Sequence, residues 1–462
     1  MYLTINKINQ IIFFLIILIG SIFNGSNSNN LIIINFFILL GYFIYLLRPK
    51  NNLSKVKFII KKNKNILIIF FIFCIYLIFQ LIPLPITLLS FFSNNYYDFL
   101  NKLGLEGMHS ISLNPRNSFF ELVNYLNIFI IILLTHLIFF KKSHINRYFF
   151  YLCLVGFIHA FFAVLLFLLG NPEYFLEKII YYKNSSTGFF INRTNLSFFL
   201  ILSFIAGLHL LFNQNFLKNN LNKHSNINFD IIYCRIFLLF ISIAIITSFS
   251  RLGNFYLLII LLIYFVFSLI KTKKIINQFS IIFSIIVIFD LFIIGFYFGG
   301  SKLIDRFLFI NEDLNINNSF NLLKDLNSTI IESYSRLDII LISKDLFYKF
   351  FLFGFGTGSY ENAFLLFYEK NFNFYANHTH SDFLELIGEV GIFGFLIFMI
   401  LFYKIFKLYI YSKPDNVYNL NLILFILIFI FLINGLTDFS LNIPSNQYLF
   451  ASLFTITLKK YY

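Results

Sequence analysis

The chain has 462 residues, of which 59% are hydrophobic and only 12% are charged, with 70 Phe and no Trp. A soluble protein of this length needs far more polar surface to cover its core, so the composition excludes a soluble globular protein and indicates a membrane-embedded one. The net charge of +14 fits nucleic-acid binding only if the basic residues lie together, so their placement along the chain decides that question.

Long apolar runs predict membrane-spanning helices, because a helix rises 1.5 Å per residue and the hydrocarbon layer is about 30 Å thick. The sequence predicts an all-α, polytopic integral membrane protein with a single membrane domain over residues 1–462. The first span is short and follows Lys7, and we expect a retained anchor rather than a cleaved signal peptide. The twelve predicted spans lie at about 11–24, 31–47, 66–89, 120–140, 149–170, 195–213, 231–248, 254–270, 279–299, 386–405, 420–434 and 446–458.

The basic residues indicate the side of the membrane on which each loop lies. With the N-terminus in the cytoplasm, 22 of the 35 Lys and Arg residues fall in cytoplasmic segments, seven of them at 48–65. Every short loop then obeys the positive-inside rule. We therefore expect cytoplasmic termini, a large periplasmic loop at 300–385 between spans 9 and 10, and no nucleic acid as a partner.

The three cysteines, Cys74, Cys153 and Cys234, lie in or beside apolar runs and have no paired spacing. This pattern predicts small buried residues rather than disulfides or a metal site.

Three arginines on the external side are candidate phosphate ligands. Arg193 precedes span 6, and Arg251 lies in the turn between spans 7 and 8. Arg336 lies in the large loop, in "SRLDIILISKDLF", which predicts an amphipathic helix on the membrane surface. A guanidinium binds phosphate through two parallel hydrogen bonds, so a phosphate-bearing lipid is the expected partner. The alternative is that these arginines only reach into the headgroup layer.

A glycine-rich stretch, "FGFGTGSYE", alternates Gly354, Gly356 and Gly358. No strand–turn–helix unit supports a dinucleotide site, and the P-loop lysine is absent. The stretch predicts a tight turn in which backbone approaches backbone or ligand, with Tyr360 as a candidate cavity-lining residue.

Acidic residues gather at the external end of span 10, in "ANHTHSDFLELIGEVGIFGFL". A Thr or Ser of "HTHS" can cap this helix. Asp382, Glu385 and Glu389 recur at helical spacing, so we expect them on one face, directed toward the bundle interior.

His378 and His380 directly precede these carboxylates. A neutral imidazole near an acidic residue is what a general base toward a sugar hydroxyl requires. Two alternatives are a metal site formed by His378, His380 and Asp382, and a solvated helix cap without catalysis. An isolated His-x-His-x-Asp pattern is a weak metal signal, and we expect neither a metal nor another cofactor.

The order and spacing of these segments resemble the O-antigen ligase and polymerase superfamily, bacterial inner-membrane enzymes that use lipid-diphosphate-linked glycans. The family usually shows His-Asn, a hydrophobic residue and L-x-E-x-G-x-x-G. Here His380 takes the place of the histidine, Ser381 replaces the Asn, and Leu386, Glu389, Gly391 and Gly394 approximate the rest. The matching segments are "ISLNPRNSFFELVNYL", "GFFINRTNLSFFL", "SFSRLGNF", "SRLDIILISKDLF", "LFGFGTGSYENAF" and "HTHSDFLELIGEVGIFGFL".

The resemblance implies a helical membrane glycosyltransferase of the GT-C type with a ligase-like core at 120–400. The donor would be an undecaprenyl-diphosphate-linked glycan, and the acceptor a hydroxyl of lipid A-core, of another glycan or of a protein. His380 would take the acceptor proton, while Arg193, Arg251 and Arg336 would bind the diphosphate. A polysaccharide transporter or flippase is the alternative, favoured by Asp290 inside span 9. The remaining candidate cavity residues are His378, Asp382, Glu385, Glu389 and Tyr360.

Overall fold

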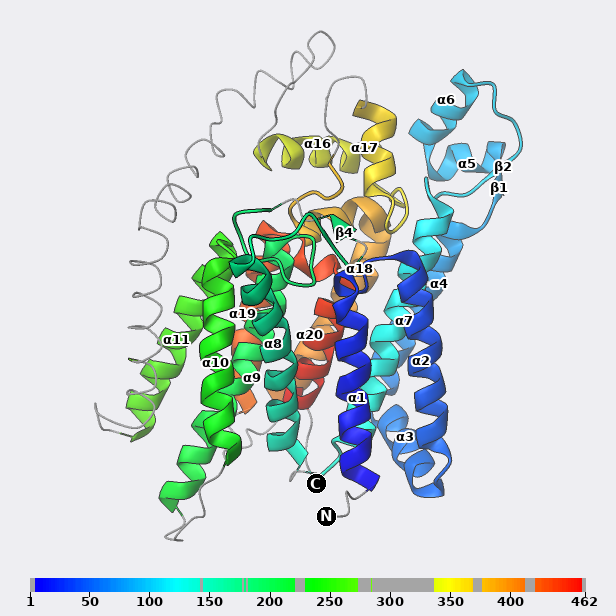
Figure 1. Ribbon diagram of the computed structural model, residues 1–462. Helices are drawn as coiled ribbons and strands as arrows, with labels where there is room; N and C mark the ends of the chain where they lie inside the picture. Colours follow the sequence, from blue (N-terminus) through cyan, green and yellow to red (C-terminus); the bar gives the residue numbers. More distant parts are fainter. Residues whose placement is uncertain are drawn as a thin grey trace.

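The protein is a bundle of long helices whose axes run in about the same direction (Figure 1). The computed structural model describes residues 5–141, 144–176, 178–179, 182–220, 229–272, 284, 336–368, 376–411 and 420–458. Among these residues, nine helices are long and apolar enough to cross a membrane. The expected helical architecture with several membrane-spanning helices is therefore confirmed, without the exact number of twelve.

The elements of the first half of the chain include seven long helices and a few short ones. In order they are α1 (Ile5–Ile22), η1 (Asn24–Ser26), α2 (Asn29–Leu47), α3 (Lys50–Lys62), α4 (Lys64–Leu81), β1 (Leu84–Pro85), α5 (Ile86–Phe92), α6 (Asn94–Lys102), β2 (Met108–His109), α7 (Pro115–Ile138), α8 (Ile145–Leu168), β3 (Tyr174–Phe175), β4 (Lys178–Ile179), α9 (Arg193–Asn220) and α10 (Phe229–Thr247).

The remaining described elements complete the bundle and cover one end of it. They are α11 (Arg251–Thr272), α16 (Arg336–Lys349), α17 (Tyr360–Tyr368), α18 (Asp382–Tyr411), α19 (Leu420–Thr437), η4 (Ser440–Asn442) and α20 (Pro444–Leu458). Figure 1 shows α16 and α17 above the long helices, at the end of the bundle opposite α3.

Eleven of the twelve predicted spans coincide with a helix, although α20 and the apolar part of α10, Ile232–Thr247, are shorter than the nine membrane-spanning candidates. Apart from residue 284, the ninth predicted span, 279–299, lies outside the described residues, and so does Asp290 within it. The third predicted span extended too far, to residue 89, whereas α4 ends at Leu81. Pro83 and Pro85 follow it, and a proline cannot donate the hydrogen bond that continues a helix.

The two pairs of strands are short and lie in loops. Leu84 pairs with His109 in the antiparallel β1–β2 ladder, which closes off the small α5–α6 extension. Tyr174 pairs with Ile179 in the β3–β4 ladder. Neither ladder changes the all-α character of the fold.

The helix α9 lies at the centre of the bundle, packed against α8, α10, α11 and α20. Residues 195–212 of α9 are buried throughout, whereas Arg193 and Thr194 in its first turn are partly exposed. Cys74, Cys153 and Cys234 are free and buried, as the sequence predicts.

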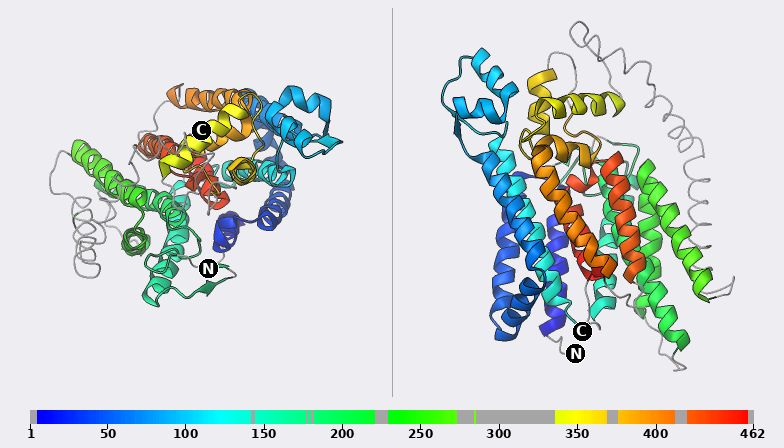
Figure 2. Two further views of the ribbon diagram at one scale, coloured as in Figure 1. Left: turned by 90° about the horizontal axis from the view of Figure 1, so that it is seen from above. Right: turned by 180° about the vertical axis from the view of Figure 1, so that it is seen from behind.

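The helix α18 is broken at Gly391, where φ is 63° and ψ is −177°. The carbonyls of the two preceding residues accept hydrogen bonds from α4, from Gln80 Nε2 (2.9 Å) and Tyr76 Oη (2.6 Å). The two following N–H groups donate to the carbonyls of Phe351 and Leu352, at 2.9 and 3.3 Å. A break inside a membrane helix requires such partners, because lipid offers none. Figure 2 shows α4 and α18 side by side.

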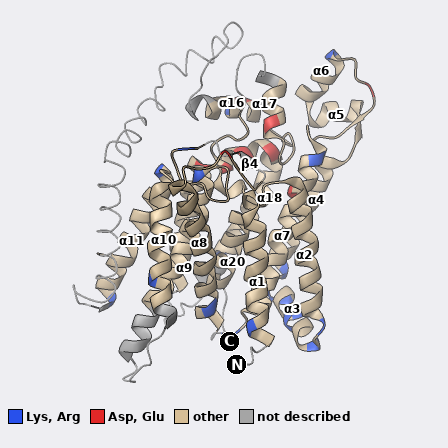
Figure 3. Cartoon of the chain, in the orientation of Figure 1, with Lys and Arg blue, Asp and Glu red and all other residues tan. Residues whose placement is uncertain are grey.

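The two ends of the bundle differ in charge. α1 begins and α20 ends at the end of the bundle where α3 lies, and lysines gather on α3 (Figure 3). Acidic residues gather at the opposite end, near α17 and the start of α18.

Candidate active site

The start of α18 is fixed by the polar residues that precede it. Ser381 Oγ accepts a hydrogen bond from the Leu384 backbone N–H (3.4 Å), so of the two expected caps, Thr379 and Ser381, it is Ser381 that caps the helix. The same hydroxyl donates to the Gly435 carbonyl (2.9 Å), which ties the cap to the end of α19. His380 has a φ of 57°, a left-handed conformation that turns the chain into the helix.

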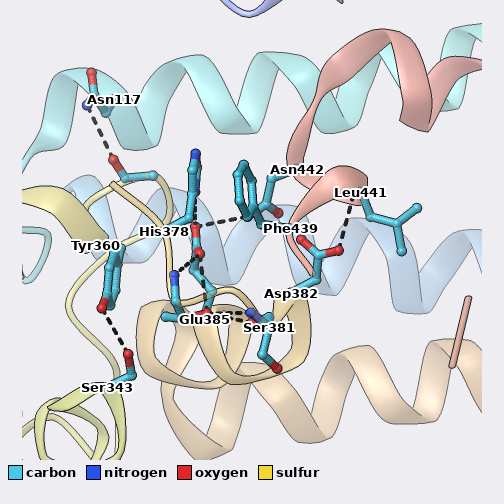
Figure 4. Close-up of polar contacts among 12 residues, drawn as sticks. Asn117, Ser343, Tyr360, His378, Ser381, Asp382, Glu385, Phe439, Leu441 and Asn442 are labelled. Atoms are coloured by element: carbon cyan, nitrogen blue, oxygen red, sulfur yellow. Dashed lines mark hydrogen bonds and ion pairs between the residues drawn. The ribbon is translucent and has the colours of Figure 1, made fainter. Parts of the chain in front are cut away.

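His378 is hydrogen-bonded to a carboxylate. Its Nδ1 lies 2.9 Å from Glu385 Oε1, and the side chain is 28% exposed whereas that of Glu385 is only 6% exposed. Asn442 Nδ2 donates to the same oxygen (2.9 Å), and the Thr379 backbone N–H donates to Oε2 (3.0 Å). Figure 4 shows His378 and Asn442 near Glu385 at the start of α18. Glu385 is therefore held in place by three donors from two separate segments.

Phe439 contacts both histidines. The His378 ring stacks on it, with centroids 4.6 Å apart and an interplanar angle of 14°. The His380 ring meets it edge to face at 5.1 Å. This aromatic contact and the bond to Glu385 together restrict how the His378 ring can turn (Figure 4).

The surroundings of His378 make it more basic. Burial alone would lower its pKa, but the Glu385 carboxylate, through its charge and its hydrogen bond, raises it, with Glu121 and Glu361 adding to the effect. The net result is a His378 pKa above the ordinary value of 6.5.

The other two carboxylates of α18 are also buried and have defined partners. Asp382 Oδ2 accepts hydrogen bonds from Asn434 Nδ2 (3.0 Å) and the Leu441 backbone N–H (3.2 Å). The Glu389 carboxylate accepts from the backbone N–H groups of the glycine-rich turn. Asp382, Glu385 and Glu389 thus share the inward face of α18, as their spacing predicts.

The connection between α19 and α20 supplies much of this site, and it was not predicted from the sequence. Asn434, Phe439 and Asn442 all contact the start of α18, and Asp438 accepts through its backbone carbonyl from Asp382 N (3.0 Å). The detectable signal was the polar stretch "NGLTDFSLNIPSN" between two apolar spans on the predicted external side.

The glycine-rich turn brings a third segment to the site. Gly354, Gly356 and Gly358 all have positive φ, which confirms the predicted tight turn. The Gly356 N–H donates to the Glu389 carbonyl (2.9 Å). On its other side the turn meets the "ISLNPRNS" segment, where Ser118 Oγ donates to the Thr357 carbonyl (2.6 Å).

Tyr360 is directed away from the histidines. Its hydroxyl lies 2.9 Å from Ser343 Oγ of α16, and the side chain is buried (Figure 4). This contact joins α17 to α16.

Each candidate phosphate-binding arginine is the first residue of a helix as the structure describes it. Arg193 begins α9, Arg251 begins α11 and Arg336 begins α16, whose first side chains are not described. The free N–H groups of a helix N-terminus favour anions. The Arg193 guanidinium lies over the Tyr182 ring (5.0 Å), and its buried Nη1 has no hydrogen-bond acceptor among the described residues.

The helix ends that bear Arg193 and Arg251 lie close together, and that of Arg193 is linked to the histidine motif. A Cβ on Gly253 would lie 2.6 Å from Ser197 Cβ, so the first turns of α11 and α9 are in close contact. Asn446 Nδ2 donates both to the Asn195 carbonyl (3.2 Å) and to the Ser440 carbonyl (2.8 Å). The first turn of α9 is thereby joined to η4, whose last residue bonds Glu385.

This end of the bundle combines an oriented imidazole, buried carboxylates and arginines at helix N-termini. Such a set can remove a proton from a hydroxyl and stabilise negative charge on a phosphate. Within the described ranges, no group of three or more His, Cys, Asp or Glu side chains could hold a metal ion.

Comparison with known proteins agrees with this chemistry. Residues 236–399 match the family model described as O-antigen ligase. The match confirms the resemblance to the O-antigen ligase and polymerase superfamily. The O-antigen ligase segment covers about a third of the chain, from within α10 to within α18, and contains Arg251, Arg336, His378 and His380, whereas Arg193 precedes it. No curated protein matches the chain.

Proposed function

We propose that the protein is a glycosyltransferase of the bacterial inner membrane, of the O-antigen ligase or polymerase type, acting in surface polysaccharide biosynthesis. It transfers a glycan from an undecaprenyl-diphosphate-linked donor to an acceptor hydroxyl on the periplasmic side. The observation that supports this most directly is the His378–Glu385 hydrogen bond, which lies inside the matched O-antigen ligase segment.

In this reaction the acceptor oxygen bonds to the anomeric carbon of the glycan while the bond from that carbon to the diphosphate oxygen breaks. The electron pair of the broken bond leaves with undecaprenyl diphosphate. In our proposal Arg193, Arg251 and Arg336 bind this leaving group, because guanidinium groups neutralise the charge that develops on it.

A histidine of the motif accepts the hydroxyl proton. The family motif assigns this role to His380, and that assignment is part of the proposal. The Phe439 ring contacts both histidines and the Glu385 carboxylate is bonded to His378, so the motif places an imidazole beside an acidic residue, as a sugar-hydroxyl base requires.

The proposal is tested in a deletion strain of the parent bacterium. We expect loss of a surface polysaccharide and accumulation of its lipid-linked precursor, both reversed by the wild-type gene. Shortened polymer indicates a polymerase, whereas full-length polymer left on the lipid carrier indicates a ligase. An unchanged polysaccharide profile contradicts the proposal. We also expect activity to persist after treatment with a chelator of divalent metals.

A further inference from the structure

Glu121 is a carboxylate that the proposed mechanism does not use. It lies on α7, one helical turn after Asn117, and both side chains are half-buried. The glycine-rich turn packs against this face of α7, because a Cβ on Gly358 would lie 3.0 Å from Glu121 Cγ and 3.5 Å from Asn117 Cβ. Asn117 Nδ2 also donates to the Gly358 carbonyl (3.3 Å). Glu121 therefore lies at the end of the bundle that carries the histidine motif.

The charge of Glu121 acts on the histidine motif. Burial lowers the pKa of His378, the Glu385 carboxylate raises it, and the Glu121 carboxylate adds to this rise. The His378 side chain is 28% exposed. Figure 4 shows His378 between Glu385 and Asn117 of α7. Glu121 and His378 thus border the same partly exposed polar surface, between α7 and the start of α18.

The Glu121 carboxylate has few hydrogen-bond partners within the protein. Among the residues that the structure describes, its one donor is Asn124 Nδ2, at 3.5 Å, whereas Glu385 is held by three donors. Asn124 is itself fixed by Gln447 Oε1 (2.7 Å) and by the Tyr448 hydroxyl (3.0 Å). An ionised carboxylate can accept about four hydrogen bonds, so most acceptor positions of Glu121 are available to a ligand.

The charge of Glu121 selects the kind of ligand that can bind there. A carboxylate repels a diphosphate, which in the proposed function lies with the arginines at the starts of α9, α11 and α16. It favours a neutral ligand that donates hydrogen bonds. A sugar carries hydroxyl donors on neighbouring carbons, whereas the Ser or Thr side chain of a protein acceptor carries a single hydroxyl. The surface beside His378 therefore fits a sugar.

We infer that Glu121 binds the acceptor by accepting a hydrogen bond from the sugar hydroxyl next to the one that reacts. This inference rests on the proposed function and leaves the proton-accepting role of His380 unchanged. No bond forms or breaks at Glu121, so its contribution is to acceptor binding and specificity. The acceptor is then a glycan and not a protein hydroxyl.

The test uses the full chain, purified in detergent, with solubilised envelope membranes of the deletion strain as the source of donor and acceptor. Release of undecaprenyl diphosphate gives the transfer rate. The rise in melting temperature caused by added undecaprenyl diphosphate reports separately on the diphosphate side of the site.

We expect Glu121→Ala to lower the transfer rate by about 10–100-fold, because hydrogen bonds to a charged group are the strong ones. Glu121→Gln keeps the shape of the side chain and one acceptor oxygen, so its loss should be smaller. Both variants should retain the wild-type rise in melting temperature, whereas Arg251→Lys should diminish it. The control Glu106→Gln, at an exposed carboxylate after α6, should change neither measurement.

The outcomes separate the two levels of the proposal. A wild-type protein that neither releases undecaprenyl diphosphate nor is stabilised by it contradicts the proposed function itself. Wild-type release with near-normal rates in both Glu121 variants overturns the present inference. A rise in melting temperature that is lost in folded Glu121→Gln also overturns it, because Glu121 would then act on the diphosphate side or on the structure as a whole. Transferred glycan that proteinase K frees from the product would identify a protein acceptor and overturn it as well.

Discussion

Gly354 and Gly391 lie backbone against backbone, so that a Cβ added to either glycine would lie 2.5 Å from the backbone nitrogen of the other. Both residues also have positive φ. The ψ of −177° at Gly391 places it in a region that essentially only glycine occupies. This pair fixes the glycine-rich turn against the break in α18.

We expect Gly391→Ala to destabilise the protein by about 3 kcal/mol or more, since strained backbone alone costs about 1–3 kcal/mol and the clash adds to it. Thermal unfolding in detergent and the amount of protein in the membrane measure this effect. Gly41→Ala in α2 is the matched control, because a Cβ there meets nothing within 4 Å. A Gly391→Ala protein as stable as Gly41→Ala would show that the break tolerates a side chain.

Arg251→Lys should lower transfer by at least about tenfold despite keeping the charge. Lysine cannot make two parallel bonds to a phosphate, and losing one charge-assisted hydrogen bond costs about 1.5–3 kcal/mol. Undecaprenyl diphosphate release at equal protein level is the measurement. Arg193→Lys should behave alike, whereas Arg48→Lys, at the exposed end of α2, should not. Full activity in Arg251→Lys would show that Arg251 only reaches into the headgroup layer and does not bind the phosphate through two parallel bonds.

Part of the stability of the protein should decline as pH rises. The folded-state pKa of His378 is raised, so its contribution is fully present below pH 6.5 and is lost as pH increases through the folded-state value. His378→Gln removes this part, so the difference in melting temperature between wild type and variant should narrow above pH 6.5. A difference that stays constant from pH 5 to pH 9 would contradict the raised pKa.

The topology can be tested at two exposed positions. In a background without the three native cysteines, a membrane-impermeant maleimide should label Glu106→Cys in intact spheroplasts. Ser54→Cys in α3 should be labelled only after lysis, because basic loops remain in the cytoplasm. Labelling of Ser54→Cys in intact spheroplasts would show that the bundle has the opposite orientation in the membrane, with the histidine motif on the cytoplasmic side.

The helices could be predicted from the sequence because the signal for them is local. An apolar run of about 20 residues has few possible structures other than a membrane-spanning helix. The same holds for the Ser381 cap and for the shared face of Asp382, Glu385 and Glu389, which follow from helical spacing. The end of α4 was misplaced because the apolar pattern continues through Pro83 and Pro85, and backbone chemistry overrides hydropathy there.

The partners of the histidine motif could not be predicted in the same way. Phe439 and Asn442 lie about sixty residues from His378 along the chain, and nothing local couples them. The break at Gly391 likewise depends on Gln80 and Tyr76 of α4, more than three hundred residues away. Such contacts depend on how the helices pack, which hydropathy does not specify.

The break in α18 also ties the helix to its neighbours on both sides of Gly391. The carbonyls before it accept from Gln80 and Tyr76 of α4, the N–H groups after it donate to Phe351 and Leu352, and further along Phe398 still packs against Phe73 of α4. A bilayer of different thickness acts on a span by changing its tilt. Because both sides of Gly391 are held to α4 and to the chain around the glycine-rich turn, a change in the tilt of α18 acts on these neighbours as well. The break thus makes α18, α4 and the glycine-rich turn respond to the thickness of the membrane as one unit.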